Sequence, residues 1–179
     1  MDILAPADLS RELREEQNSD LGRRRWIIGL SFTGSAIGAI VSLYQTGIIK
    51  RLPDILPGKI FDAEKVDASD YAYKRLQSPD GPLMVMTYAA TAAFAAAGGA
   101  ERAKRQPALP LALAGKALYD LATCLKLGQE EWSENRKLCS WCQVATAISA
   151  VTTALALPEA IRAGRVLLTG SNEGAQVAA

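Results

Sequence analysis

Long apolar segments alternate with short charged segments along this chain. Four segments contain few or no charged residues, and they span residues 26–49, 83–100, 107–127 and 138–161. A helix rises about 1.5 Å per residue, so about 20 residues cross a hydrocarbon core of about 30 Å. The second segment is near the lower limit for such a crossing. Because a chain of 179 residues is too short to bury four such helices in a water-soluble core, the pattern predicts four transmembrane helices.

The charged segments predict how these helices are connected. We expect a tail or short surface helix over residues 1–25, a membrane domain over 26–163 and a frayed C-terminal tail over 164–179. The long loop 50–82 contains a stretch with helical spacing, which is either an amphipathic helix on the membrane surface or an ordered loop with a helical turn. Its apolar side is formed by Val66, Tyr73 and Leu76. Pro158 is expected to kink or end the fourth helix.

Basic residues indicate the orientation in the membrane. They flank the apolar segments on one side at Arg23, Arg24, Arg25, Arg102, Lys104, Arg105, Arg162 and Arg165. Cytoplasmic loops carry an excess of Lys and Arg, so we expect that side, with both chain termini, to be cytoplasmic. The loop 50–82 is then extracytoplasmic.

Two patterns within the apolar segments predict helix contacts. Gly34 and Gly38 are four residues apart, a spacing that allows another helix to approach closely in lipid. Lys116 and Asp120 share one helix face and can pair. A charge pair within a membrane helix is costly unless it faces the bundle interior or a cavity. The pair is therefore either structural or the polar site of a small-molecule carrier.

Composition excludes several classes of function. The formal net charge is +1, with 20 basic and 19 acidic residues, so no overall field favours nucleic acid. The chain has no histidine, which removes the usual general base and the commonest metal ligand.

The three cysteines, Cys124, Cys139 and Cys142, include one Cys-x-x-Cys pair. Structural zinc and iron–sulfur sites need four ligands, and c-type haem needs His where Gln143 stands, so we expect no metal. Thiol–disulfide chemistry and two incidental cysteines remain as alternatives. The pair lies where the fourth helix begins, and there the helix dipole is expected to stabilise a thiolate, helped by Arg136 and Lys137.

Three segments resemble a known family. They are LCSWCQVATAISAVTTALALPE at 138–159, YQTG at 44–47 and VDAS at 66–69. Together with the order of the apolar segments, they resemble bacterial members of the vitamin K epoxide reductase family over residues 24–163. The family usually carries a second cysteine pair in the loop after the first helix. This chain has no cysteine in residues 50–82, and Cys124 is a poor substitute.

The resemblance implies an all-α, four-helix transmembrane bundle with a long extracytoplasmic loop between helices 1 and 2. It implies an integral membrane oxidoreductase, in the bacterial inner membrane, that passes electrons from a dithiol through Cys139 and Cys142 to a quinone. Cys142 would face the quinone, Cys139 would exchange with a thioredoxin-like partner, and Trp141 and Thr146 would line the quinone site. The alternative is a non-catalytic subunit or scaffold of a larger membrane complex, which the missing loop pair and the alanine-rich second segment favour.

Overall fold

The computed structural model describes residues 5–177, with side chains as far as Thr169. Helices dominate this range and it contains no strand, which confirms the predicted all-α class. The elements are α1 (Pro6–Glu15), α2 (Ser19–Gln45), α3 (Ala63–Asp67), the 3₁₀ helix η1 (Asp70–Tyr73), α4 (Asp80–Ala96), α5 (Arg102–Arg105), α6 (Ala108–Asn135) and α7 (Ser140–Val177).

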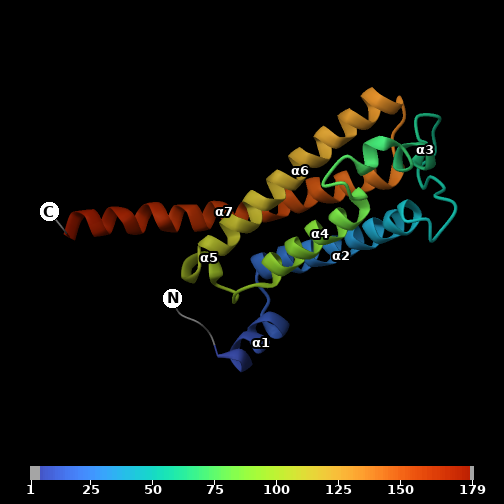
Figure 1. Cartoon of the computed structure of the whole chain (residues 1–179). Helices are drawn as coiled ribbons and strands as arrows, with labels where there is room; N and C mark the ends of the chain where they lie inside the picture. Colours follow the sequence, from blue (N-terminus) through green and yellow to red (C-terminus); the bar gives the residue numbers. More distant parts are fainter. Residues whose placement is uncertain (1–4, 178–179) are drawn as a thin grey trace.

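The long helices α2, α4, α6 and α7 run along the length of the molecule (Figure 1). Helix α2 packs mainly on α4, and α6 packs mainly on α7, while α2–α7 and α4–α6 contacts join the two pairs. Helix α3 lies at one end of the molecule, and α1 and α5 lie towards the other. The C-terminal part of α7 extends beyond the packed helices.

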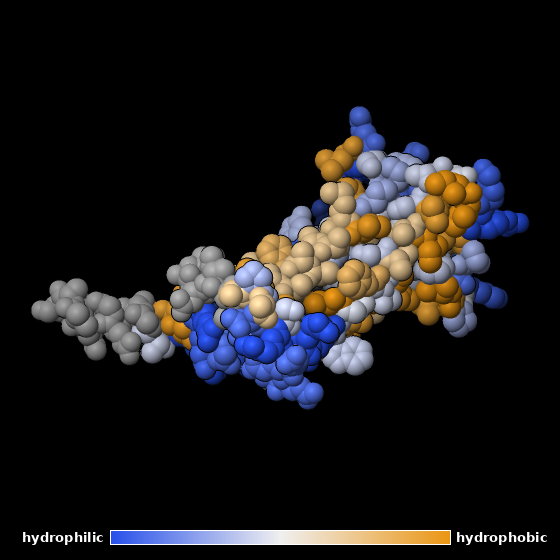
Figure 2. Space-filling model, turned by 90° about the horizontal axis from the view of Figure 1, so that it is seen from below, coloured by the Kyte–Doolittle hydropathy of each residue, from blue (hydrophilic) through white to orange (hydrophobic). Residues whose placement is uncertain are grey.

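Three of the long helices have the length and composition of membrane-crossing segments. These are Ser19–Gln45, Ala108–Asn135 and the part of α7 from Ser140 to Thr169. Many large apolar side chains face outwards from the long helices, among them Trp26, Phe32, Met86, Leu118 and Val151. Figure 2 shows apolar surface over the middle of the molecule and hydrophilic groups gathered towards its ends. Such a surface is suited to lipid.

Glycine allows α2 and α4 to approach closely, as the Gly34 and Gly38 spacing predicted. A Cβ atom at Gly34 would lie 2.6 Å from the Tyr88 ring, and one at Gly38 would lie 3.1 Å from the Val85 backbone nitrogen. On α4, a Cβ at Gly81 would lie 2.7 Å from the Ser42 backbone nitrogen. Small residues on both helices therefore permit this contact.

The helices are longer than the apolar segments predicted. Helix α2 begins at Ser19, where the Asn18 side chain accepts a hydrogen bond from the Leu21 N–H. The helix therefore begins before the apolar segment 26–49, because capping by Asn18 starts it ahead of the arginines. Helix α6 likewise continues past the apolar segment 107–127 and ends at Asn135, followed by Arg136 in a left-handed conformation.

Pro158 does not end α7, and residues 164–177 are helical where a frayed tail was expected. The helix is held on both sides of the proline because Ala156, Ala160 and Ala163 are buried and Glu159 is bound by Arg102. Residues 178–179 of the expected C-terminal tail, and residues 1–4 of the N-terminal one, lie outside the described part of the chain.

The expected amphipathic stretch at 62–77 is two short elements, α3 and η1. Val66 is fully buried, but Leu76 is 84% exposed, so the two side chains do not share one apolar face. Instead, Val66 packs with Val41, Leu52 and Cys139 in a core cluster. This part of the loop therefore closes one end of the helix assembly.

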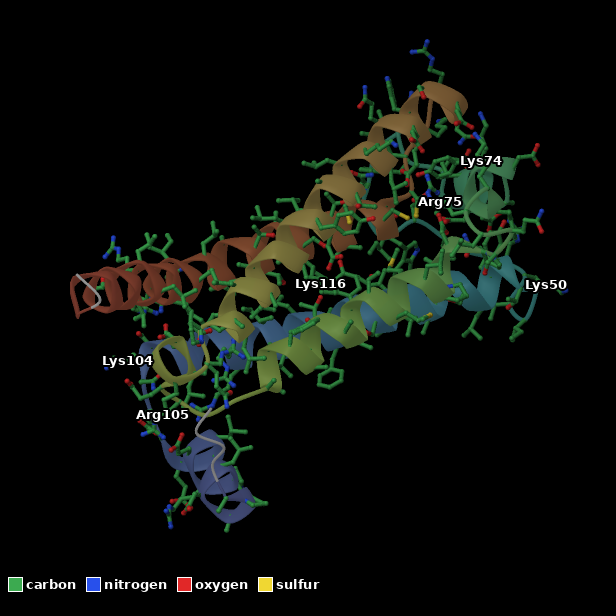
Figure 3. The ribbon with its side chains drawn as sticks, turned by 60° about the vertical axis from the view of Figure 1, so that its left-hand side comes forward. Lys50, Lys74, Arg75, Lys104, Arg105 and Lys116 are labelled. Atoms are coloured by element: carbon green, nitrogen blue, oxygen red, sulfur yellow. The ribbon has the colours of Figure 1, made fainter. Side chains whose placement is uncertain are left out.

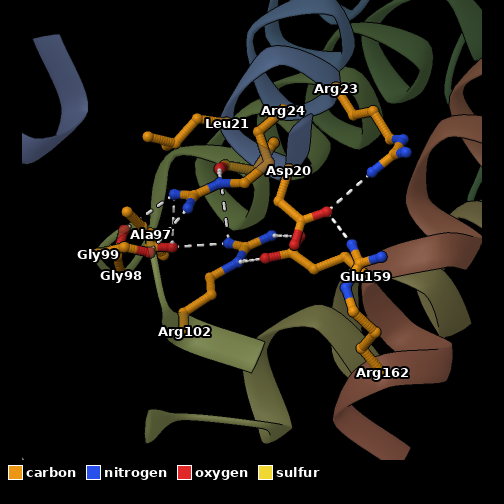
Figure 4. Close-up of polar contacts among 12 residues, drawn as sticks. Asp20, Leu21, Arg23, Arg24, Ala97, Gly98, Gly99, Arg102, Glu159 and Arg162 are labelled. Carbon is orange, nitrogen blue, oxygen red and sulfur yellow. Dashed lines mark hydrogen bonds and ion pairs between the residues drawn. The ribbon is translucent and has the colours of Figure 1, made fainter. Parts of the chain in front are cut away.

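Buried arginines hold the opposite end together (Figure 4). Arg24 donates hydrogen bonds to five consecutive backbone carbonyls, those of residues 95–99. Arg102 makes two 2.8 Å hydrogen bonds to the Glu159 carboxylate and also donates to the carbonyls of Phe94 and Ala97. These bonds satisfy carbonyls at the C-terminal end of α4, which its own helix leaves unpaired.

Candidate active site at the cysteine pair

The two cysteines lie at the start of α7, as the sequence indicated. Cys139 immediately precedes the helix, and Cys142 is in its first turn. Both are free thiols, and the Cys142 backbone N–H donates a 3.3 Å hydrogen bond to the Cys139 sulfur. Cys139 is completely buried, whereas Cys142 is partly buried.

A strap formed by residues 51–62 covers Cys139. It pairs with Leu138 through two 3.0 Å backbone hydrogen bonds, from Asp62 N–H to the Leu138 carbonyl and from Leu138 N–H to the Ile60 carbonyl. The Ser140 hydroxyl donates to Asp54 at 2.6 Å. The Trp141 indole donates to the Pro53 carbonyl at 3.0 Å. Thiols outside the protein therefore cannot reach Cys139 while the strap is in place.

Cys142 opens into a cavity of about 300 Å³ between α4, α6 and α7. The cavity is mostly apolar, and among its lining residues are Tyr71, Arg75, Met84, Tyr88, Tyr119, Asp120, Cys124, Glu131, Cys142 and Thr146. Thr146 is thus one of the cavity-lining residues. Trp141 is not among the lining residues, because its indole is turned towards the strap.

Two buried carboxyl groups flank the pair. Glu131 of α6 accepts hydrogen bonds from the Cys139 backbone N–H at 3.2 Å and from the Gln143 side chain at 3.4 Å. At the end of α3, an Asp67 carboxyl oxygen and the sulfurs of Cys139 and Cys142 all lie within 4.8 Å of one another. The Asp67 Oδ2 atom is buried and has no hydrogen-bond partner among the described residues.

Burial and acidic neighbours oppose ionisation around Cys139. Burial raises the pKa of Asp67 to about 7, although a hydrogen bond with Cys139 counteracts the shift. For Cys139, a hydrogen bond with Cys142 lowers the pKa, but burial and Asp67 outweigh it and raise the pKa to about 11. The expected N–H bond at the helix start is present and lowers the pKa of Cys139, but burial and Asp67 outweigh it, so the net shift is upward. Lys137 does not compensate, because its ammonium group binds the Lys59 carbonyl.

The family model described as "Vitamin K epoxide reductase family" matches residues 25–157, which include both cysteines, Asp67 and all the cavity-lining residues. The chain belongs to this family. No curated protein and no solved structure matches it. Membership makes the chain a membrane oxidoreductase, of a family that is quinone-linked in general.

This vitamin K epoxide reductase family member has one described group of side chains with the spacing of metal ligands. It consists of Asp67, Cys139 and Cys142. Two sulfurs and one carboxylate oxygen are one donor short of a closed zinc site. We therefore consider the group as a pair of thiols with a carboxyl neighbour.

The remaining polar candidates of this family member lie deeper between the helices. Lys116, in the middle of the molecule in Figure 3, pairs with Asp120 and donates to the Thr91 hydroxyl at 2.8 Å. Both charges are thus bound within the protein, which favours the structural interpretation. Cys124 lines the same cavity as Cys142, with its sulfur 3.7 Å from the Ser149 hydroxyl.

Asp67, Glu131 and Asp54 were not recognised as site residues from the sequence. Asp67 belongs to the VDAS tetrapeptide that supported the family resemblance, and this was the only signal available for it. Glu131 was interpreted as part of a charged connector, because nothing in the sequence shows that α6 continues past it. Both carboxyls reach the pair only through the packing of α3 and α6 against the start of α7.

Proposed function

We propose that this protein passes electrons from a dithiol through Cys139 and Cys142 to a quinone. Family membership supports a membrane oxidoreductase. The identity of the electron donor and acceptor, and the roles of the two cysteines, are part of the proposal.

The observation that carries the proposal is that the two sulfurs face different surroundings. Cys142 lines an apolar cavity of about 300 Å³, at the low end of the size of ligand pockets. Cys139 lies beneath the strap, on the side from which a protein partner can approach once the strap opens. A disulfide formed between these two thiols would join the apolar cavity to the side that faces a protein partner.

The proposed chemistry has two halves. A partner thiolate attacks Cys139 of the oxidised pair, Cys142 leaves as a thiolate, and the second partner thiol then releases Cys139 and forms the partner's disulfide. In the second half, the dithiol becomes a disulfide again by giving up two electrons and two protons. The quinone accepts both and leaves as a quinol.

The other predicted site residues take different parts in this proposal. Thr146 lines the cavity one turn below Cys142 and donates its hydroxyl to the Cys142 carbonyl at 2.9 Å, so it is a candidate quinone contact. Trp141 binds the Pro53 carbonyl and is better suited to hold the strap.

We further propose that α4 is the fourth membrane crossing. It has 17 residues, but α2 is its main packing partner and it carries no charged residue between Gly81 and Ala100. The membrane domain is then residues 26–163, and the loop 50–82 with the cysteine pair is extracytoplasmic. Figure 3 places Lys104 and Arg105 at the end opposite Lys50, Lys74 and Arg75. By the positive-inside tendency, the Lys104 end, with both termini, faces the cytoplasm of a bacterial inner membrane.

The absence of loop cysteines makes direct exchange with a partner necessary. The proposed partner is a thioredoxin-like protein, because its thiol is carried on an exposed surface that can dock against the strap. Docking must then displace the strap, since Cys139 has no exposed surface.

Single cysteine variants test the proposal because the two sulfurs have different roles. Membranes containing the wild-type protein should reduce a soluble quinone analogue when a dithiol is supplied. Cys142→Ala and Cys139→Ala should both abolish this reaction. When a thioredoxin-like protein is added with its cysteine pair oxidised, the Cys139 thiolate of Cys142→Ala should attack that disulfide, release one partner thiolate and form a mixed disulfide, whereas Cys139→Ala should not.

Quinone reduction by Cys142→Ala at the wild-type rate would contradict the proposal. A folded wild-type protein that reduces no quinone and forms no mixed disulfide would instead support the scaffold alternative. Exposed Glu15→Ala on α1, far from the pair, is the matched control and should leave both assays unchanged.

A further inference from the structure

The described structure leaves one buried carboxyl oxygen beside the cysteine pair without a partner. Asp67 is 1% exposed, and its Oδ2 atom accepts no hydrogen bond from any described residue. A polar atom in such a position costs stability unless it binds something or reacts. Its nearest chemistry is the two sulfurs, which lie within 4.8 Å of an Asp67 oxygen and of each other.

Thiol–disulfide chemistry requires a proton to move at this point. The attacking species is a thiolate, yet Cys139 is sealed from water and has no cation among the groups that shift its pKa. Water therefore cannot remove the Cys139 proton directly. A base is needed within the sealed compartment.

We propose that Asp67 is the proton acceptor of the pair: its carboxylate takes the proton of the Cys139 thiol as the disulfide forms, and its carboxylic acid returns a proton when the disulfide is opened. This inference rests on the redox role proposed above for Cys139 and Cys142.

The proton balance closes over one cycle. During oxidation, the Cys142 thiol first adds to the oxidant and gives it the Cys142 proton. The Cys139 thiolate, whose proton stays on Asp67, then attacks the Cys142 sulfur, so that the S–S bond forms as the bond between Cys142 and the oxidant breaks. The oxidant leaves with the two electrons and takes its second proton from water. During reduction, a partner thiolate attacks Cys139, the S–S bond breaks, and Asp67 protonates the leaving Cys142 thiolate. The proton lost by the second partner thiol neutralises Cys139.

Asp67 is better placed for this role than its acidic neighbours. Several charged or titratable groups act on Asp67 or on the pair besides the two thiols themselves. They include Asp54 of the strap, Tyr44 of α2, Tyr71 and Tyr73 of η1, Asp80 and Tyr88 of α4, and Glu131 of α6. Glu131 already accepts bonds from the Cys139 backbone and Gln143. Asp54 accepts bonds from Ser140 and from the Ala63 N–H at 3.1 Å. Asp67 combines proximity to both sulfurs with an unpartnered oxygen.

Burial also gives Asp67 a suitable proton affinity. Its pKa, raised to about 7, lets the carboxylate form at neutral pH and still accept a proton. An ordinary exposed aspartate would be a much weaker base.

The test measures closure of the Cys139–Cys142 disulfide by diamide, a small two-electron oxidant, in the reduced full-length protein in detergent. Diamide replaces the quinone, so the result is independent of whether the protein uses a quinone. The wild-type rate should rise with pH up to about 7 and then level off. Asp67→Asn should be slower by about 100-fold at pH 7, the usual contribution of a general base.

The pH profile separates proton transfer from a structural role. Without the carboxylate, the rate should follow the thiolate fraction, which rises about tenfold per pH unit below the thiol pKa. The deficit of Asp67→Asn should therefore shrink to within about threefold of wild type by pH 9. Asp67→Glu should recover part of the rate at pH 7, and exposed Asp70→Asn should behave as wild type.

Two outcomes would overturn the inference. One is an Asp67→Asn rate equal to wild type at pH 7. The other is the same fold-loss at pH 7 and pH 9, which indicates that the side chain only supports the structure.

Discussion

The two ends of this molecule bury charge in opposite ways. At the α5 end, Arg24 is bound by five carbonyls and Arg102 by a bidentate contact with Glu159 (Figure 4). At the α3 end, Asp67 and Glu131 are buried beside two thiols, and the Oδ2 atom of Asp67 has no hydrogen-bond partner among the described residues.

This difference in hydrogen bonding indicates a structural role for one end and a reactive role for the other. A buried charge with complete hydrogen bonding is stable in one protonation state and resists change. A buried acid with one unpartnered oxygen is poised between two protonation states, because burial opposes its charged form. The arginine end therefore fixes the helices, while the cysteine end retains groups that can react.

The largest expected loss of stability comes from breaking the buried ion pair between Arg102 and Glu159. Arg102→Met leaves Glu159 buried and unpaired, so the free energy of unfolding should fall by about 3–5 kcal/mol. Thermal unfolding of the detergent-solubilised protein measures this. The double variant Arg102→Met/Glu159→Met should lie closer to wild type, and a double variant that is as unstable as the sum of both single ones would contradict the pairing. Exposed Glu101→Ala is the control.

At the other end, neutralising an acid should stabilise the protein. The Asp67 pKa is about 7 in the fold, against an ordinary value of 3.8, so the fold prefers the neutral acid. Wild-type stability should fall as pH rises from about 4 to about 7 and then stay level. Asp67→Asn should therefore gain on the order of 4 kcal/mol at pH 8 and almost nothing at pH 4. Unfolding at both pH values decides this, and equal gains at both would refute it.

A smaller effect is expected at the strap. Asp54→Ala removes the bonds to Ser140 and Ala63, which should lower the free energy of unfolding by about 1 kcal/mol. The strap should open more often, and an impermeant maleimide should then label Cys139 faster, as peptide mapping by mass spectrometry would show. Asp70→Ala is the control. Unchanged labelling would mean that Asp54 does not hold the strap.

The smallest loss of stability is expected at an exposed ion pair, which serves as the reference for the other variants. Lys74 and Glu134 form an exposed pair at the cysteine end, with side chains 51% and 40% exposed. Lys74→Ala should change the free energy of unfolding by less than about 0.5 kcal/mol, because water solvates both charges. A loss of stability comparable to that of Arg102→Met would show that burial does not explain the difference between this exposed ion pair and the buried Arg102–Glu159 pair.

The sequence predicted the features that depend on local chemistry. Apolar length located the long helices, the spacing of Gly34 and Gly38 predicted the close contact with α4, and the Cys-x-x-Cys pattern placed the pair at the start of α7. Helix ends were predicted less well. Charged residues such as Arg24 and Glu131 end an apolar segment without ending a helix, because packing and capping decide where the helix stops.

The surroundings of the pair could not be predicted for a different reason. Asp67 and Cys139 are far apart along the chain and meet only because α3 folds onto the start of α7. The helix-dipole argument for a thiolate considered only neighbours in sequence, and it missed the acids and the burial that raise the pKa of Cys139. The sign of an electrostatic effect depends on all the charges nearby.

The closure over Cys139 also has a consequence for oxidative damage. Peroxide attacks thiolates that are exposed, and further oxidation to sulfinic acid is irreversible for most proteins. A sulfur with no exposed surface and a raised pKa is a poor target for it. While the strap is closed, Cys139 is thus protected against irreversible oxidation to the sulfinic acid.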